Sequence, residues 1–143
     1  MNSKSQNKYI FSILFLILFL SVSMVSMDNV SAADTSLYVN GTSGDDKYDG
    51  TSPIVVDDYI GPKKYIQSAL DVVGDDGTVN VAEGTYRESL IINRNVVLNG
   101  SGYTKTELIP AQVEDNVITI NSGVTKATVN GFTITGATNS RDC

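Results

Sequence analysis

The side chains that could do chemistry in this sequence are restricted by two absences. The chain contains no His, and its single Cys is the last of 143 residues. Ser-His-Asp triads, Cys-His dyads and His-liganded zinc are therefore excluded within the chain, and no internal disulfide can form. Only carboxylate, Lys, Arg or Tyr chemistry remains.

The densest group of carboxylates lies in the segment Asp45-Asp46-Lys47-Tyr48-Asp49-Gly50. Asp45, Asp46 and Asp49 are close enough in sequence to hold a calcium ion. Lys47, however, stands where an EF-hand loop carries a second carboxylate, and no Glu closes the loop. The alternative is a solvated turn, which we favour, so we assign the chain no metal, no cofactor and no catalytic residue.

Asparagine recurs at the expected turns, at Asn93, Asn99, Asn121 and Asn130, and Gly follows it directly at Asn99 and Asn130. These amides could hydrogen-bond to one another along a stack of turns, or they could bind a sugar; we favour the ladder. Two N-glycosylation sequons, Asn40-Gly41-Thr42 and Asn99-Gly100-Ser101, fall on expected turns. In an exported chain both could be modified.

The elements that position these residues are short. Leu37-Tyr38-Val39 predicts a strand, and the polar stretch from Asn40 to Ser52, with three Gly and three Asp, predicts a loop. One helix is expected from Pro62 to Val73, beginning at Gly61-Pro62 and ending at a left-handed Gly74. Its apolar positions fall on one face: Ile66, Ala69, Leu70 and Val73.

From Thr78 onward β-branched residues alternate with polar ones, which predicts a series of strands. The expected strands contain Val79 and Val81, Leu90 to Ile92, Val96 to Leu98, Val117 to Ile120, Ala127 to Val129 and Phe132 to Ile134. The expected turns between them are Gly84-Thr85, Asn93-Arg94-Asn95, Asn99-Gly100-Ser101-Gly102, Asn121-Ser122-Gly123 and Asn130-Gly131.

The strands and turns form a repeat. Ile91-Ile92-Asn93 followed by Val97-Leu98-Asn99-Gly100 recurs as Thr119-Ile120-Asn121 followed by Thr128-Val129-Asn130-Gly131, with three extra residues in the second turn. Antiparallel hairpins with Asn-Gly turns are one interpretation. The strands are short and the repeat is about one solenoid coil long, which favours coils stacked on one another.

The N-terminal segment resembles a secretory signal. Lys4 and Lys8 precede the uncharged run from Ile10 to Val25, and small residues at Val30 to Ala33 suit cleavage after Ala32 or Ala33. A retained anchor is the alternative, although the run is slightly shorter than the ~20 residues that span a bilayer. We therefore divide the chain into a signal peptide, 1–33, and one domain, 34–143, that is secreted or displayed at the cell surface.

The expected mature chain, from Ala33, is acidic. It carries eight Lys and Arg against fifteen Asp and Glu, a net charge of −7. Nucleic acid and anionic membranes are excluded as partners because both require clustered Lys and Arg.

The segment from Leu37 to Ala137 resembles the N-terminal part of right-handed parallel β-helix proteins of the pectin-lyase-like fold, especially adhesin-like surface proteins of methanogenic archaea. The similar motifs are Leu37-Tyr38-Val39-Asn40 with Gly44-Asp45-Asp46 and Asp49-Gly50-Thr51-Ser52, Lys64-Tyr65-Ile66-Gln67-Ser68-Ala69-Leu70, the segment Thr78 to Glu88, and Val129 to Gly136. The resemblance implies an all-β, single-stranded, right-handed parallel β-helix with a short N-terminal capping helix. Because members of the family continue through many more coils, it also implies a truncated chain.

The resemblance allows two functions. One is a non-catalytic adhesin-like protein whose coils present a binding surface to an extracellular polysaccharide or another surface protein, and we favour it. The other is the N-terminal fragment of a polysaccharide lyase or hydrolase. Lyases of this fold use an Arg or Lys base beside carboxylates that hold calcium. The cations Arg87, Arg94, Lys105 and Lys126 show no such pairing in sequence, and we expect Tyr86 and Tyr103 to pack rather than to stack on a sugar.

Overall fold

The computed structural model describes residues 36–136. The expected leader, 1–33, and Cys143 lie outside the described residues. The elements are β1 (Ser36–Val39), α2 (Ile66–Val72), β2 (Gly77–Val81), β3 (Gly84–Arg87), β4 (Leu90–Ile92), β5 (Val96–Gly100), β6 (Thr106–Ile109), β7 (Ile118–Ile120), β8 (Ala127–Asn130) and β9 (Thr133–Ile134). No helix in this part of the chain is long and apolar enough to cross a membrane.

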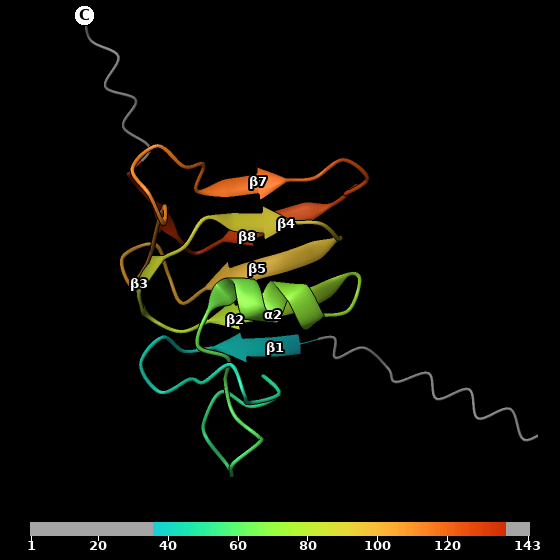
Figure 1. Ribbon diagram of the computed structural model, residues 1–143, viewed down its shortest axis with the longest axis vertical. Helices are drawn as coiled ribbons and strands as arrows, with labels where there is room; N and C mark the ends of the chain where they lie inside the picture. The colour runs from blue at the N-terminus through green and yellow to red at the C-terminus, as the bar shows by residue number, and fades with distance from the viewer. Residues whose placement is uncertain (1–35, 137–143) are drawn as a thin grey trace, which may run out of the picture. The chain divides into compact units, whose positions relative to one another are not determined.

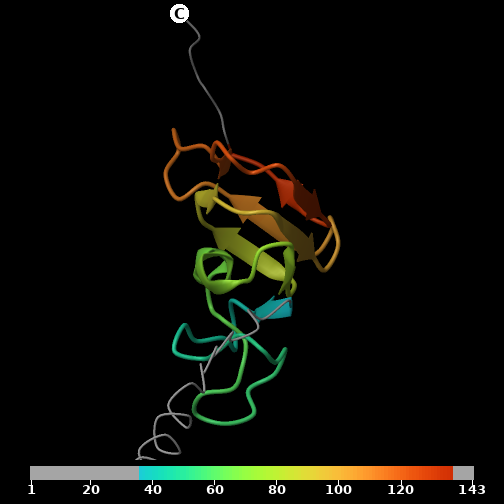
Figure 2. The ribbon, with the colours of Figure 1, turned by 90° about the vertical axis from the view of Figure 1, so that its right-hand side faces the viewer.

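The strands form three parallel sheets, and successive strands enter them in turn (Figure 1). The first sheet has the order β1-β2-β5-β8, the second β3-β6-β9 and the third β4-β7. From β2 onward the chain visits the first, second and third sheets in the same order each time. Figure 2 shows the chain advancing along its long axis from β1, in cyan, to the red strands. The structure is therefore mostly strand with one short helix, as the sequence predicts.

The sequence repeat sets the register of these sheets. Ile91 pairs with Thr119 in the third sheet, and Leu98 pairs with Val129 in the first. These are the equivalences that the repeat predicts. Every strand pairing among residues 36–136 is parallel, so the hairpin interpretation is wrong.

The core is a set of apolar columns that run from strand to strand. In the first sheet, Leu37, Val79 and Leu98 are in register and almost fully buried. In the second sheet Tyr86 is in register with Leu108, and in the third Leu90 is in register with Ile118. We call one passage of the chain through the first, second and third sheets a coil. Each apolar residue packs on its equivalent in the next coil, so burial is greatest where a coil has a neighbouring coil on both sides.

Three expected turns are wrong in part. Gly84 and Thr85 begin β3, where they pair with Thr106 and Glu107, and the strand from Thr106 to Ile109 was not predicted. The expected Asn-Gly turns at Asn99-Gly100 and Asn130-Gly131 begin inside β5 and β8. A Cβ on Gly100 would collide with the Gly131 carbonyl oxygen. These glycines therefore allow close approach of two coils rather than a hairpin turn.

The helix differs from its predicted bounds at both ends. Its apolar face is buried as predicted, with Ile66, Ala69, Leu70 and Val73 in the core. It begins at Ile66 rather than Pro62, because Lys63 is extended and forms a parallel bridge with Val39. It ends when Val73 becomes extended, so the left-handed Gly74 is wrong; Asp76 takes the positive φ, 58°.

Side chains from later in the sequence hold both ends of α2. Glu88 accepts hydrogen bonds from the N–H groups of Ile66 (2.9 Å) and Gln67 (3.0 Å). The Arg94 guanidinium donates to the carbonyls of Val73 and Asp71 at the other end. A carboxylate at the N-terminus and a cation at the C-terminus both complement the helix dipole.

The side chain of Gln67 joins the helix to the third sheet. Its amide nitrogen donates to Ile91 O (3.2 Å), and its amide oxygen accepts from Ile91 N (2.8 Å). The side chain thus makes the two bonds that a neighbouring strand would make to β4. Helix α2 covers this edge of the third sheet (Figure 1).

Candidate functional site

One row of polar side chains crosses the whole first sheet. Tyr38, Asn80, Asn99 and Asn130 are in register on β1, β2, β5 and β8. They alternate with the buried apolar residues, so they lie on the outer face of the sheet. We call these four residues the asparagine row.

Hydrogen bonds hold the amides of this row. Asn130 Nδ2 donates to Asn99 Oδ1 (3.2 Å), and Asn80 Nδ2 donates to Ser36 Oγ (3.0 Å). The predicted ladder is thus confirmed between Asn99 and Asn130, although on strands rather than turns. No hydrogen bond joins the amides of Asn93 and Asn121, which are both described and lie in turns.

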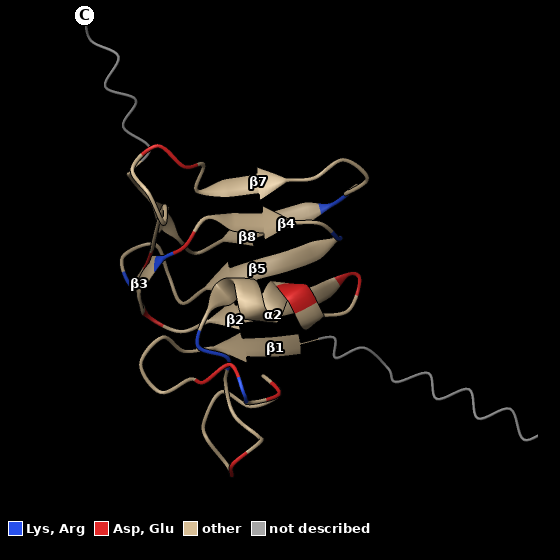
Figure 3. Ribbon diagram, viewed as in Figure 1, with Lys and Arg blue, Asp and Glu red and all other residues tan. Residues whose placement is uncertain are grey.

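A hollow of about 380 Å³ lies over this face. The row lines it through Tyr38, Asn80 and Asn99, and the remaining lining residues are Val39, Pro53, Val81, Ala82, Gly100 and Ser101. The strands β1, β2, β5 and β8 contain no charged residue (Figure 3). The hollow therefore offers uncharged donors and acceptors beside apolar surface, which suits a neutral ligand rich in hydroxyl groups.

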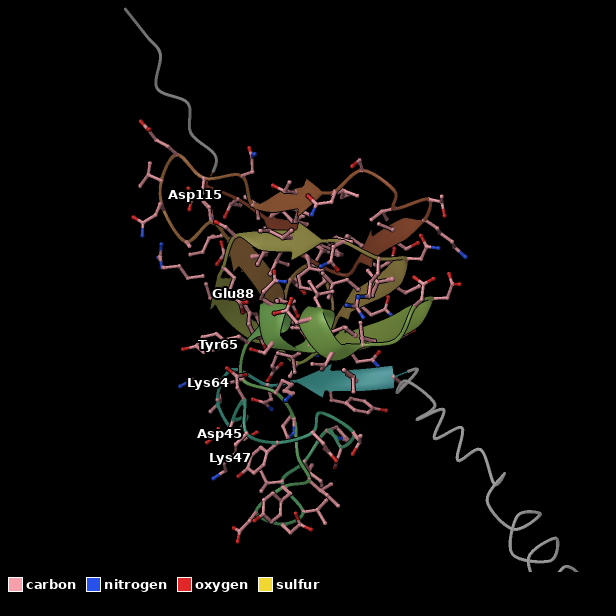
Figure 4. All side chains as sticks on the ribbon, turned by 45° about the vertical axis from the view of Figure 1, so that its right-hand side comes forward. Asp45, Lys47, Lys64, Tyr65, Glu88 and Asp115 are labelled. Atoms are coloured by element: carbon pink, nitrogen blue, oxygen red, sulfur yellow. The ribbon has the colours of Figure 1, made fainter. Side chains whose placement is uncertain are left out.

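The three aspartates of the possible calcium site hold the backbone of their own loop. Asp45 accepts from Lys47 N and forms an ion pair with Lys47 Nζ at 3.7 Å. Asp46 accepts from the N–H groups of Lys64 (3.1 Å) and Tyr65 (3.2 Å). Figure 4 places Asp45 and Lys47 on the loop outside β1.

Asp49 accepts from the N–H and hydroxyl of Thr51, both at 2.9 Å. Burial alone would raise the pKa of Asp49, but these hydrogen bonds, a further one from Gly61 N–H and the charge of Lys63 bring it below its ordinary value. Among residues 36–136 no group of three or more His, Cys, Asp or Glu side chains could hold a metal ion. The structure therefore uses these carboxylates in turns.

A second hollow, of about 260 Å³, lies on the outer face of the second sheet. Tyr103, Lys105 and Glu107 line it, together with Thr85, Thr104, Thr106 and Thr133. Tyr103 is 72% exposed, so the prediction that it packs is wrong. Glu107 accepts from the hydroxyls of Thr135 (2.9 Å) and Thr85 (3.3 Å). This hollow brings together a cation, a carboxylate and an aromatic ring, a grouping that the sequence did not reveal.

The remaining candidate catalytic and sugar-binding residues are either packed within the fold or exposed on its surface. Tyr86 is buried, as predicted; its hydroxyl accepts from Gly41 N (3.2 Å) and donates to Ala82 O (3.1 Å). Burial raises the pKa of Tyr86, and the nearby charge of Glu88 raises it further. Arg94 supports the helix, and Arg87 and Lys126 are exposed on the surface.

Comparison with known proteins yields no relative. No family model matches the sequence, no curated protein resembles it, and no solved structure matches the fold at a significant level. The function is therefore inferred from the geometry of this chain.

Proposed function

We propose that residues 34–143 form the N-terminal cap and first coils of a single-stranded, right-handed parallel β-helix of the pectin-lyase-like kind. The repeated order of strands through three parallel sheets supports the β-helix. Crossovers between parallel strands of one sheet are right-handed in almost all proteins, which supports the right-handed winding of the β-helix. Helix α2 fits the capping helix of the family because it covers the edge of β4.

We further propose that the protein is exported and displays this β-helix as a non-catalytic, adhesin-like binding surface. The observation that carries the proposal is the asparagine row beside an uncharged hollow. A row that repeats once per coil can contact a repeating polymer at several points, and each contact adds to the total affinity. An extracellular polysaccharide is therefore the favoured ligand, with another surface protein as the second choice.

Binding of immobilised polysaccharides by the exported full chain tests this proposal. The panel contains neutral glucans, mannans and galactans and, as an acidic member, polygalacturonate. We expect a neutral polymer to bind, and the double variant Asn80→Ala/Asn99→Ala to bind it at least about tenfold more weakly, since each lost hydrogen bond contributes about 1 kcal/mol.

Asn93→Ala is the matched control, because Asn93 is an exposed turn residue outside the row. It should bind like the wild type. Failure of every neutral polymer to bind, or equal binding by the double variant, would count against the proposal.

A polysaccharide-degrading enzyme is the second candidate, and the hollow with Lys105, Glu107 and Tyr103 favours it. If the protein is such an enzyme, Lys105 would act as the base and Tyr103 would stack on a sugar ring. Calcium-dependent release of unsaturated products from polygalacturonate, lost in Lys105→Ala, would establish the enzyme and overturn the binding proposal.

A further inference from the structure

The two sequons within residues 36–136 have different backbone conformations. Asn40 follows β1, and its Oδ1 accepts from the N–H groups of Thr42 (2.9 Å) and Ser43 (3.1 Å). This is an Asx turn, which depends only on residues adjacent in sequence. It can therefore form in a newly translocated chain before the coils have stacked.

The second sequon is extended. Asn99 lies in β5, and strand geometry separates residues i and i+2 by about 6.6 Å along the chain. Its partner Ser101 donates its hydroxyl to Val81 O (2.9 Å), and Asn99 Oδ1 accepts from Asn130. Both polar groups of this sequon are thus engaged with other coils.

From this contrast we propose that Asn40, and not Asn99, carries an N-linked glycan in the exported protein. The Asx turn uses the oxygen of the Asn40 amide, and no hydrogen bond engages Nδ2 within the described residues. Gly41 and Thr42 are exposed, so the turn is accessible to a transferase. A glycan on Nδ2 leaves the hydrogen bonds to Thr42 and Ser43 intact.

The donor would be an oligosaccharide joined through phosphate to a lipid carrier. A bond forms between Asn40 Nδ2 and the anomeric carbon, and the bond from that carbon to the phosphate oxygen breaks. The electron pair of the broken bond stays on the phosphate oxygen, the phosphate remains attached to the lipid carrier, and a base of the transferase takes one Nδ2 proton. No oxidant or reductant is required.

The full chain is expressed in a glycosylating secretory host, behind its own leader and in parallel behind a leader of that host. Peptide mass spectrometry of the exported protein should show one glycan, at Asn40. Thr42→Ala should abolish it while keeping the Asn40 side chain. Ser101→Ala, the matched change in the other sequon, should leave it in place.

A glycan at Asn99, with or without one at Asn40, would overturn the proposal, and so would an exported chain without any glycan. The sequence contains another sequon, Asn29-Val30-Ser31, within the expected leader and outside the described residues. A glycan found there and not at Asn40 also contradicts the proposal.

Discussion

The two ends of the stack of parallel strands differ in how they are covered. At the N-terminal end a loop and helix α2 cover the first coil: the loop bonds to β1 through Tyr38 N to Gly50 O (2.8 Å) and Lys63 N to Tyr38 O (2.9 Å). At the other end β7, β8 and β9 have a neighbouring strand on one side only among the described residues. Core-column residues there are partly exposed, and Ile134 is 47% exposed.

This difference shows what a coil needs for stability. A residue in a column is buried by the coil before it and the coil after it, so Leu98 is fully buried while its register partner Val129 is only half-buried. The N-terminal end substitutes a helix and a loop for the missing coil. Stability should therefore fall along the stack from the covered end to the uncovered one.

The largest expected effect is at the covered end. Ile66→Ala removes a fully buried side chain of α2 and should lower the free energy of unfolding by about 2–5 kcal/mol. The matched change Ile134→Ala, in β9, should cost less than about 1 kcal/mol because the side chain is half-exposed. Urea denaturation of both variants measures the difference; equal losses would contradict it.

Several features of the covered end could be predicted from sequence, and others could not. The apolar face of α2 is visible as a helical pattern within one segment. Its N-terminal N–H groups are bound by Glu88, which lies 22 residues beyond Ile66, and no local pattern shows that contact. The signal that could have drawn attention to Glu88 is a carboxylate between the buried Tyr86 and the buried Leu90.

The asparagine row shows a similar limit. The repeat predicts that Asn99 and Asn130 are equivalent, and the structure confirms it. That Asn80 and Tyr38 join them depends on coil length, which varies from coil to coil. The second hollow was missed because Thr106 to Ile109 contains too few alternating residues to predict a strand.

A smaller loss is expected from the carboxylate that caps α2. Glu88→Ala leaves two helix N–H groups without their acceptor and should cost about 1–3 kcal/mol. Glu88→Gln keeps one acceptor oxygen and should cost less. Glu83→Ala, at an exposed carboxylate of the same coil, should stay within about 0.5 kcal/mol of the wild type. A loss for Glu83→Ala equal to that for Glu88→Ala would contradict the capping role.

The same carboxylate should make the covered end sensitive to pH. Burial raises the pKa of Glu88 above its ordinary 4.5, and the charge of Asp46 raises it further, while the helix N–H groups oppose both. Protonation therefore favours the folded chain. As the pH falls from neutral through the raised pKa toward 4.5, the wild type should gain stability relative to Glu88→Gln.

Thermal unfolding of the two proteins across this pH range tests the prediction. Asp46, Tyr86 and Glu88 are the titratable groups at this contact, and only Glu88 differs between the proteins. A difference in stability that does not change with pH, or that moves in the opposite direction, rules out the assignment to Glu88.

The smallest expected effect lies toward the uncovered end. A double-mutant cycle between Asn99→Ala and Asn130→Ala should give a coupling energy of about 0.5–1 kcal/mol, because one hydrogen bond joins partly exposed amides. The pair Asn93→Ala and Asn121→Ala, whose amides do not bond to each other, is the control and should show no coupling. Coupling in the control pair alone would contradict the ladder.

Amide hydrogen exchange of the full chain compares the two ends of the stack most directly. We expect the amides of β2 and β5, which have strands on both sides, to exchange only when the whole domain unfolds. The amides of β7 and β9 should exchange faster, through local opening. Uniform protection from β2 to β9, or stronger protection of β7 and β9, would contradict a stack that is stabilised from its covered end.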